Sequence, residues 1–172
     1  AWDALLSSKS GVKKIVEFNT DKLSCKIAST VTNFTPEAIV PARELRKMDK
    51  FIHFALIAAN EAIADSGWKP EDEYSKERTG IMVGSGIGGL GTIEDTSVEY
   101  HKEERPRVSP YFIPACLINL ISGHISIMHG FSGPNSAVAT ACSTGAHAIG
   151  DAARMIKYGD ADVMVAGGAE AP

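Results

Sequence analysis

The chain has 172 residues, of which 44% are hydrophobic and 22% charged, and its net charge is −4. This balance is typical of a globular domain with its own core; it excludes a largely disordered chain and argues against a nucleic-acid partner, which would need a basic surface. The longest apolar stretch, residues 111–128, is too short and too polar to predict a membrane span.

Three helices are expected in the first part of the chain. A short helix opens the sequence, and residues 12–35 look irregular, with an extended piece at 26–28. A helix is predicted near 36–40. A longer helix follows over 48–66 and ends at Gly67; its many apolar residues indicate that it is mostly buried.

The middle of the chain predicts a strand between helices. The apolar run 81–83 reads as a buried strand and is followed by a glycine-rich loop, 84–91. A helix is expected over 92–100 and a charged surface loop over 102–107. A second buried helix is predicted over 114–128.

The last third predicts a strand, a helix and a strand, at 137–141, 143–158 and 162–166. Small and β-branched residues make up the first strand, and Gly159 ends the helix. Because the connections are tight, the pattern indicates a βαβ unit with a parallel sheet.

Cys142 stands where this strand ends and this helix begins, among small residues that leave room for a substrate and for a sharp turn. The N–H groups at a helix start, and the positive end of its dipole, stabilise a thiolate and could bind the oxyanion of a thioester. A cysteine is more often an ordinary core residue. We expect Cys25 and Cys116 to be structural, whereas its location favours Cys142 as a nucleophile.

The three cysteines have no CxxC spacing, and their number is odd. Neither a disulfide framework nor a zinc site is indicated. Reduced thiols fit a cytoplasmic location best.

The sequence resembles a known family, the β-ketoacyl-[acyl-carrier-protein] synthases, and within it the type II enzymes of dissociated fatty-acid synthesis. The matching segments are 46–49, 84–91, 109–112, 123–124, 133–136, 140–145 and 159–170. The resemblance implies an α/β, thiolase-like αβαβα layered fold. Residues 1–172 would be one N-terminal ketosynthase domain, the N-terminal half of that fold, truncated at both ends.

The resemblance also implies a reaction. An acyl group passes from the acyl carrier protein to Cys142, malonyl-carrier protein loses CO2, and the resulting carbanion attacks the thioester to give a 3-oxoacyl chain. Cysteine suits this chemistry because a thiolate both attacks and leaves well. The implied partners are the acyl carrier protein and acyl and malonyl thioesters, with a homodimer in the full-length enzyme and no organic cofactor.

The glycine loop has a second interpretation, because Gly84, Gly86 and Gly89 match a dinucleotide-binding fingerprint after a strand. The match is weak, since no acidic residue ends a following strand at the required distance. The plain alternative is a tightly packed loop. The resemblance implies instead that Ile87 lines the acyl pocket, with Phe112 near the same tunnel across a dimer contact; ordinary core packing is the alternative for both.

Three basic residues, Arg43, Arg46 and Lys47, would share one face if their segment is helical. A solvated helix face is the usual meaning of such a cluster. The resemblance implies docking of an acidic acyl carrier protein through charge attraction.

The five histidines are expected to be structural or exposed. His147 lies roughly 140° around the helix from Cys142 and should not face the sulfur, and the spacing of His124 and His129 predicts no metal site. The resemblance implies that two catalytic histidines, a supporting lysine and a phenylalanine gate belong to a second half of the enzyme. Acylation is then the most that these residues could achieve alone, with exposed sheet edges and apolar surface.

Two other classes stay open. One is a non-catalytic binding module, either decayed or similar to a chain-length factor; such partners tend to lack the nucleophile. The other is a nucleotide-binding domain that uses the glycine loop. Among condensing enzymes, type I and polyketide ketosynthases are near neighbours, and thiolases are less favoured because the basic face suits a carrier protein.

Overall fold

The computed structural model describes residues 2–32, 34–102, 104 and 107–171. The chain divides into two compact units, Ala1–Thr35 and Pro36–Pro172. The first unit contains the helix α1 (Trp2–Leu6) and two short antiparallel strands, β1 (Lys13–Lys14) and β2 (Ile27–Ala28). It matches the expected short helix and extended piece within an otherwise irregular segment.

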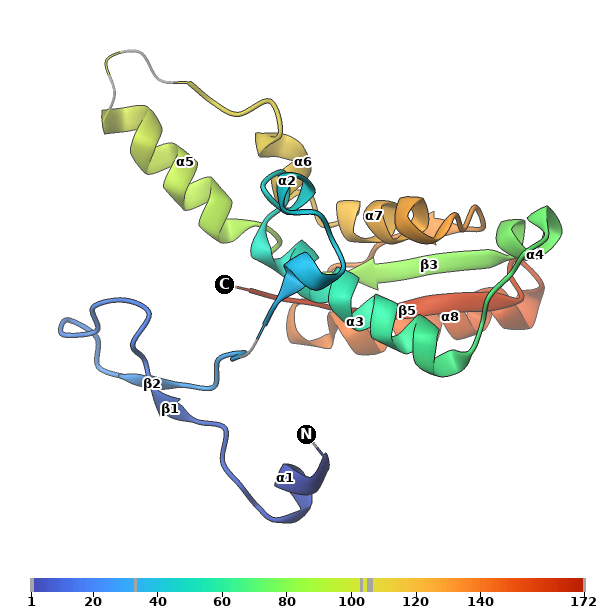
Figure 1. Cartoon of the computed structure of the whole chain (residues 1–172), viewed down its shortest axis with the longest axis horizontal. Helices are drawn as coiled ribbons and strands as arrows, with labels where there is room; N and C mark the ends of the chain where they lie inside the picture. Colours follow the sequence, from blue (N-terminus) through green and yellow to red (C-terminus); the bar gives the residue numbers. More distant parts are fainter. Residues whose placement is uncertain (1, 33, 103, 105–106, 172) are drawn as a thin grey trace. The chain divides into compact units, whose positions relative to one another are not determined.

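The second unit is built around a parallel sheet of three strands, in the order β4-β3-β5; Figure 1 shows β3 beside β5. These strands are β3 (Thr79–Gly84), β4 (Asn135–Ser136) and β5 (Val163–Gly168). Strand β3 is buried along its whole length. The predicted βαβ unit is parallel, as expected, but its two strands are not neighbours, because β3 from earlier in the chain lies between them.

Helices cover both faces of this sheet. On one face, Ile81 and Val83 pack into a core with α3 (Lys50–Ser66) and α7 (Leu120–His129). On the other, Gly84 lies against α8 (Thr144–Tyr158). The largest fully buried apolar side chains of the helices are Phe51, Ile52, Leu56, Ile121 and Ile125.

The long helix α3 nearly matches its prediction. The carboxylate of Asp49 accepts a hydrogen bond from the N–H of Phe51 and caps its start. Gly67 ends it with a left-handed backbone, φ 69°, which glycine adopts without steric cost. Its buried residues all lie between Phe51 and Ala59, so the prediction of a mostly buried helix holds only for the first part.

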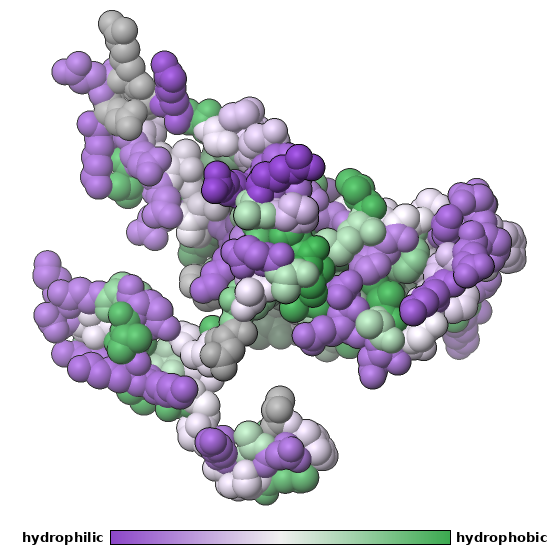
Figure 2. Space-filling view, in the orientation of Figure 1, coloured by the Kyte–Doolittle hydropathy of each residue, from purple (hydrophilic) through white to green (hydrophobic). Residues whose placement is uncertain are grey.

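The remaining elements are short, except for α5 (Leu90–Lys102), which confirms the helix expected over 92–100. They are η1 (Pro36–Ala38), α2 (Ala42–Leu45), α4 (Glu73–Glu77), α6 (Phe112–Cys116) and η2 (Ala141–Ser143). Of the charged loop predicted over 102–107, residues 103, 105 and 106 lie outside the described residues. Figure 2 shows hydrophilic residues over the end of the unit that carries α4, and hydrophobic ones nearer the centre of this face.

The helix predicted over 114–128 is wrong as a single element. It is two helices, α6 and α7, because Leu117 between them has an extended backbone with ψ 128°. The apolar pattern alone could not show this break, since both helices bury apolar residues. No helix among the described residues is long and apolar enough to cross a membrane.

The strand predicted over 137–141 is also wrong in its bounds, because β4 contains only Asn135 and Ser136. The hydroxyl of Ser122, on α7, takes the place of the next strand residue. Its Oγ lies 3.0 Å from both the N and the O of Val83, and 2.7 Å from the O of Ser136. The N–H of Val83 is therefore satisfied by a side chain, whose single hydroxyl proton is shared between the carbonyls of Ser136 and Val83, and the segment after Ser136 leaves the sheet.

Candidate active site

Cys142 lies at the carboxyl end of the sheet, in the turn η2 that leads into α8, and its side chain is exposed. The residue before it, Ala141, has φ 51°, a left-handed conformation that is uncommon for a residue other than glycine. Sharp and strained turns of this kind present a nucleophile to solvent at the end of a sheet. The predicted strand-to-helix position of Cys142 is therefore found, with a 3-10 turn between the two elements.

Hydrogen bonds within the turn fix its shape. The N–H of Ser143 donates to the O of Thr140 at 3.1 Å, and the N–H of Thr144 donates to the O of Ala141. The hydroxyl of Thr144 accepts from the N–H of Thr140 and donates to the O of Ala141, both at 2.8 Å. The expectation that the first N–H groups after Cys142 are available to a substrate is thus wrong for these two, because the turn itself uses them.

His147 is connected to this turn, although its spacing from Cys142 predicted an uninvolved residue. Its Nδ1 lies 3.3 Å from the hydroxyl of Thr140, and its Nε2 lies 3.0 Å from the carboxylate of Asp151. Asp151 stands four residues after His147, so both side chains fall on one face of α8. His147, itself paired with Asp151, thus connects α8 to the side chain of Thr140.

An apolar groove of about 360 Å³ begins next to the turn. Ile87 lines it, as predicted, and so do residues of two further segments: Cys116, Leu117, Ile118 and Asn119 in one, and Ala137, Val138 and Ala139 in the other. The lining thus reaches to three residues before Cys142. Phe112 is not among the lining residues; it begins α6, the helix whose last residue, Cys116, lies in the groove. An apolar groove of this size beside an exposed thiol can hold part of a hydrocarbon chain.

The glycine loop lies directly against the turn. A Cβ atom added to Gly86 would be 3.0 Å from the Cα of Ala141 and 3.0 Å from a carboxylate oxygen of Glu170. A Cβ atom at Gly84 would meet the O of Val138 and the side chain of Thr144. These glycines are therefore needed for close packing, which agrees with the plain alternative to the dinucleotide interpretation.

The carboxylate of Glu170 binds the polar groups of this loop. The sequence alone did not indicate this role. One carboxylate oxygen accepts from the N–H groups of Gly86 at 2.8 Å and Ile87 at 3.0 Å. The other accepts from the hydroxyl of Ser85 at 2.9 Å. A loop whose N–H groups already hold a carboxylate cannot offer them to a nucleotide phosphate, so the geometry speaks against the dinucleotide interpretation.

The basic residues lie where α2 ends. The helix stops at Leu45; Arg46 caps it with helical backbone angles, φ −64° and ψ −12°, and Lys47 follows in a turn. Glu44 interacts with two of the three cations: its carboxylate lies 3.4 Å from Arg43 and 2.8 Å from Lys47. The hydrogen bond from Lys47 lowers the pKa of Glu44. Arg46 is exposed.

The three cysteines differ in their surroundings. Burial, with a smaller effect from the carboxylate of Asp49, raises the pKa of the Cys116 thiol, which makes it a poor nucleophile near neutral pH. Cys25 is exposed and its thiol lies 3.4 Å from the O of Ile27. Only Cys142 combines exposure, a helix start and a neighbouring apolar groove among the described cysteines.

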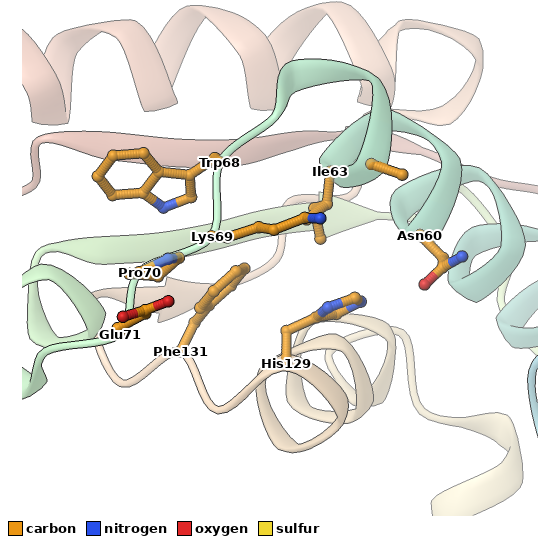
Figure 3. A pocket seen from close by; sticks show the side chains of 9 residues that line it. Asn60, Ile63, Trp68, Lys69, Pro70, Glu71, His129 and Phe131 are labelled. Carbon is orange, nitrogen blue, oxygen red and sulfur yellow. The ribbon is translucent and has the colours of Figure 1, made fainter.

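A second cavity, of about 340 Å³, lies at the other end of the sheet, where β3 begins (Figure 3). Trp68 and the residues that follow α3 form one side, and His129 and Phe131 form the other. No cysteine lines it. Because Cys142 lies near the opposite end of β3, this cavity is separate from the candidate active site.

Comparisons with known proteins agree with this geometry. The family model "Beta-ketoacyl synthase, N-terminal domain" matches residues 1–172. The 3-oxoacyl-[acyl-carrier-protein] synthase 2 of Rhizobium meliloti (strain 1021) is 47% identical over 179 residues, which cover 100% of this chain and 42% of the relative. The protein of the same name from Vibrio cholerae serotype O1 is 48% identical, over 99% of this chain and 41% of the relative.

Among solved structures, the chain is similar to a ketosynthase determined with its type II PKS acyl-carrier protein. The TM-score is 0.76 at 31% identity, over 83% of this chain and 40% of the other. The predicted α/β, thiolase-like layered fold, of which the chain represents the N-terminal half, is thereby confirmed. The chain spans 42% of the length of the Rhizobium relative. It belongs to the β-ketoacyl synthase family, in which it corresponds to the N-terminal domain.

Proposed function

We propose that this chain is the nucleophile-bearing part of a 3-oxoacyl-[acyl-carrier-protein] synthase of type II, which elongates fatty acids. The observation that carries the proposal is the exposed thiol of Cys142 at the start of α8, beside an apolar groove, in a chain 47% identical to an enzyme of that name. The partners are an acyl carrier protein and acyl and malonyl thioesters, and the chemistry uses no organic cofactor.

The first step transfers the acyl group. The Cys142 thiolate attacks the thioester carbonyl of the acyl-carrier protein, the new C–S bond forms, and the carrier thiolate leaves and takes up a proton. The positive end of the α8 dipole stabilises negative charge at this position. Since the turn uses the N–H groups of Ser143 and Thr144, we assign the N–H of Cys142 itself to the oxyanion.

The second step forms the carbon–carbon bond. Malonyl-carrier protein loses CO2, the electron pair of the broken bond becomes a carbanion, and this carbanion attacks the Cys142 thioester, from which the thiolate leaves. The two histidines, the lysine and the phenylalanine gate that promote this step belong, in our proposal, to a second half of the enzyme. The surface of α8 agrees with such a half, because Ile149 and Ile156 are exposed on the flank next to the buried Ala148 and Ala152.

The acyl chain extends from Cys142 into the groove lined by Ile87, with Phe112 reaching the same tunnel across the contact of a homodimer. The enzyme works in the cytoplasm, where reduced thiols are stable.

The basic residues Arg43, Arg46 and Lys47 dock the acidic carrier protein. Replacing all three with Glu should weaken binding strongly and in a salt-dependent way. Titration of fluorescent carrier protein at two salt concentrations measures this, and an unchanged affinity of the triple variant would refute the docking assignment.

The test of the function uses the full-length protein with acyl-carrier protein and mass spectrometry of tryptic peptides. We expect the acyl mass on the Cys142 peptide, its loss in Cys142→Ala, and its presence in Cys25→Ala and Cys116→Ala. Malonyl-carrier protein should then release it as a 3-oxoacyl product. Persistent lack of acylation at Cys142 in folded protein would instead favour a non-catalytic, chain-length-factor-like module.

A further inference from the structure

We propose that Glu170 is a positioning residue, which fixes both the turn that carries Cys142 and the wall of the acyl groove. The inference rests on the function proposed above, because it concerns the same site. Glu170 does not line the groove, so its effect is exerted through the glycine loop.

The carboxylate holds the loop by hydrogen bonds to successive backbone groups. Gly86 and Ile87 donate their N–H groups to one oxygen at 2.8 and 3.0 Å, and Ser85 donates its hydroxyl to the other at 2.9 Å. Successive N–H groups that converge on one anion form a nest, and bonds to a carboxylate are stronger than bonds to a neutral acceptor. The Ser85 hydroxyl also accepts from the N–H of Gly88 at 3.1 Å, so the bonds extend across the loop.

This loop in turn holds the nucleophile. Gly86 is packed so closely that an added Cβ would lie 3.0 Å from the Cα of Ala141. Ala141 has the strained φ of 51° and directly precedes Cys142. A strained conformation persists only where its surroundings over-determine it. If the loop loosens, Ala141 can relax, and the sulfur moves away from the position that it needs for attack.

The same loop shapes the groove. The N–H of Ile87 donates to Glu170, while the side chain of Ile87 lines the groove. One carboxylate thus links the nucleophile turn and the chain-binding wall. Loss of Glu170 should slow acylation and also change which acyl chains are accepted, whereas a loss of stability alone would change neither property of the folded fraction.

The experiment compares Glu170→Ala and Glu170→Gln with Glu61→Ala, an exposed carboxylate of α3, in the full-length protein. We expect Glu170→Ala to acylate Cys142 about ten- to a hundredfold more slowly, since displacements of about 1 Å cost that much. Long acyl chains should lose more than acetyl, Glu170→Gln should be intermediate, and Glu61→Ala should match the parent. Sodium formate should restore part of the rate to Glu170→Ala by entering the nest, and sodium chloride should not.

Amide hydrogen exchange provides a readout that does not depend on catalysis. The amides of Gly86 and Ile87 should exchange faster in Glu170→Ala, and formate should slow them again. Acylation at the parent rate and chain preference in folded Glu170→Ala would overturn the proposal, and so would unchanged exchange of both amides. If the parent protein accepts no acyl group, the proposed function fails, while hydrogen exchange still decides whether Glu170 positions the loop.

Discussion

At the level of single residues, the site depends on the conformation of Ala141. A left-handed backbone destabilises an alanine by roughly 1–2 kcal/mol. The packing of Gly86 and the hydrogen bond between Thr140 and Thr144 offset this cost and hold Ala141 in place. The strain is thus located one residue before the proposed nucleophile, Cys142, where it turns the chain from the sheet toward α8.

Gly86→Ala should therefore damage the site more than the fold. The new methyl group would lie about as close as backbone atoms allow, 3.0 Å from the Cα of Ala141, and must displace the turn. We expect acylation of Cys142 to fall by about tenfold. Gly91→Ala is the matched control, because an added Cβ there meets its nearest atom at an ordinary 3.9 Å. Equal rates for the two variants would contradict this reading of the turn.

Glu44 offsets part of the positive charge of Arg43, Arg46 and Lys47. Its carboxylate lies 2.8 Å from Lys47 and 3.4 Å from Arg43, so under the proposed docking it would compete with a carrier protein for both cations. Glu44→Gln should tighten carrier binding by up to about fivefold at low salt, with a smaller gain at high salt. Fluorescence titration at two ionic strengths measures the effect. Weaker binding of the variant would place the docking surface elsewhere.

At the level of elements, Ser122 joins a helix to two strands. Its side chain is fully buried, and its hydroxyl reaches the backbone of Val83 in β3 and of Ser136 in β4. The Ser122 hydroxyl thus makes hydrogen bonds that a further residue of β4 would otherwise make. Strand β4 can therefore end at Ser136, and the chain continues past Ala139 to the turn at Ala141.

Ser122→Ala should lower the free energy of unfolding by about 1–3 kcal/mol, because the buried N–H of Val83 loses its acceptor. Ser66→Ala is the control: its hydroxyl donates to the O of Ile63 and accepts from the N–H of Trp68, but both bonds are exposed, so water can replace them. The control should stay within about 0.5 kcal/mol of the parent. Urea unfolding of the three proteins makes the comparison, and similar losses for both variants would argue against the role of Ser122.

At the level of the whole molecule, two histidines couple stability to pH. Burial lowers the pKa of both His124 and His129, and Glu44 partly opposes this for His124. Within the described residues, the Nε2 atoms of both are buried without a hydrogen-bond partner, which suits neutral rings.

Because the folded pKa values are lowered, the unfolded chain binds more protons as the pH falls through the ordinary histidine value of 6.5. Their contribution to stability is present above that pH and is lost below it. His129→Phe keeps the stacking on Phe131 and removes one titrating group. Urea unfolding at pH 7.5 and pH 5.5 should show a smaller pH-dependent loss for the variant; an equal loss would rule out His129 as a contributor.

Much of the fold could be predicted from local patterns. The strand at 81–83, the helices ended by Gly67 and Gly159, and the final strand all lie within a few residues of their expected places. These signals are local, since apolar runs and terminal glycines are read from neighbouring residues. The strand order, the break at Leu117 and the early end of β4 depend on contacts between distant segments, such as Ser122 with Val83, and could not be predicted this way.

The candidate site divides in the same manner. Cys142 could be found because its surroundings are local in the sequence, and Ile87 through the family resemblance. Glu170 and the pair His147–Asp151 could not be assigned, because their partners lie in the loop at Ser85–Ile87 and at Thr140. A carboxylate shortly after a sheet strand, opposite a glycine loop, is the signal that could have indicated Glu170.

The central place of β3 has a consequence for synthesis of the chain. Both of its hydrogen-bonding edges are matched only by strands that are translated after it, one near Asn135 and one near Val163. A nascent chain must therefore keep an apolar, entirely interior segment unpaired until the ribosome has delivered nearly all of the residues described. During synthesis this segment can therefore aggregate or bind chaperones until β5 has been translated and has paired with it.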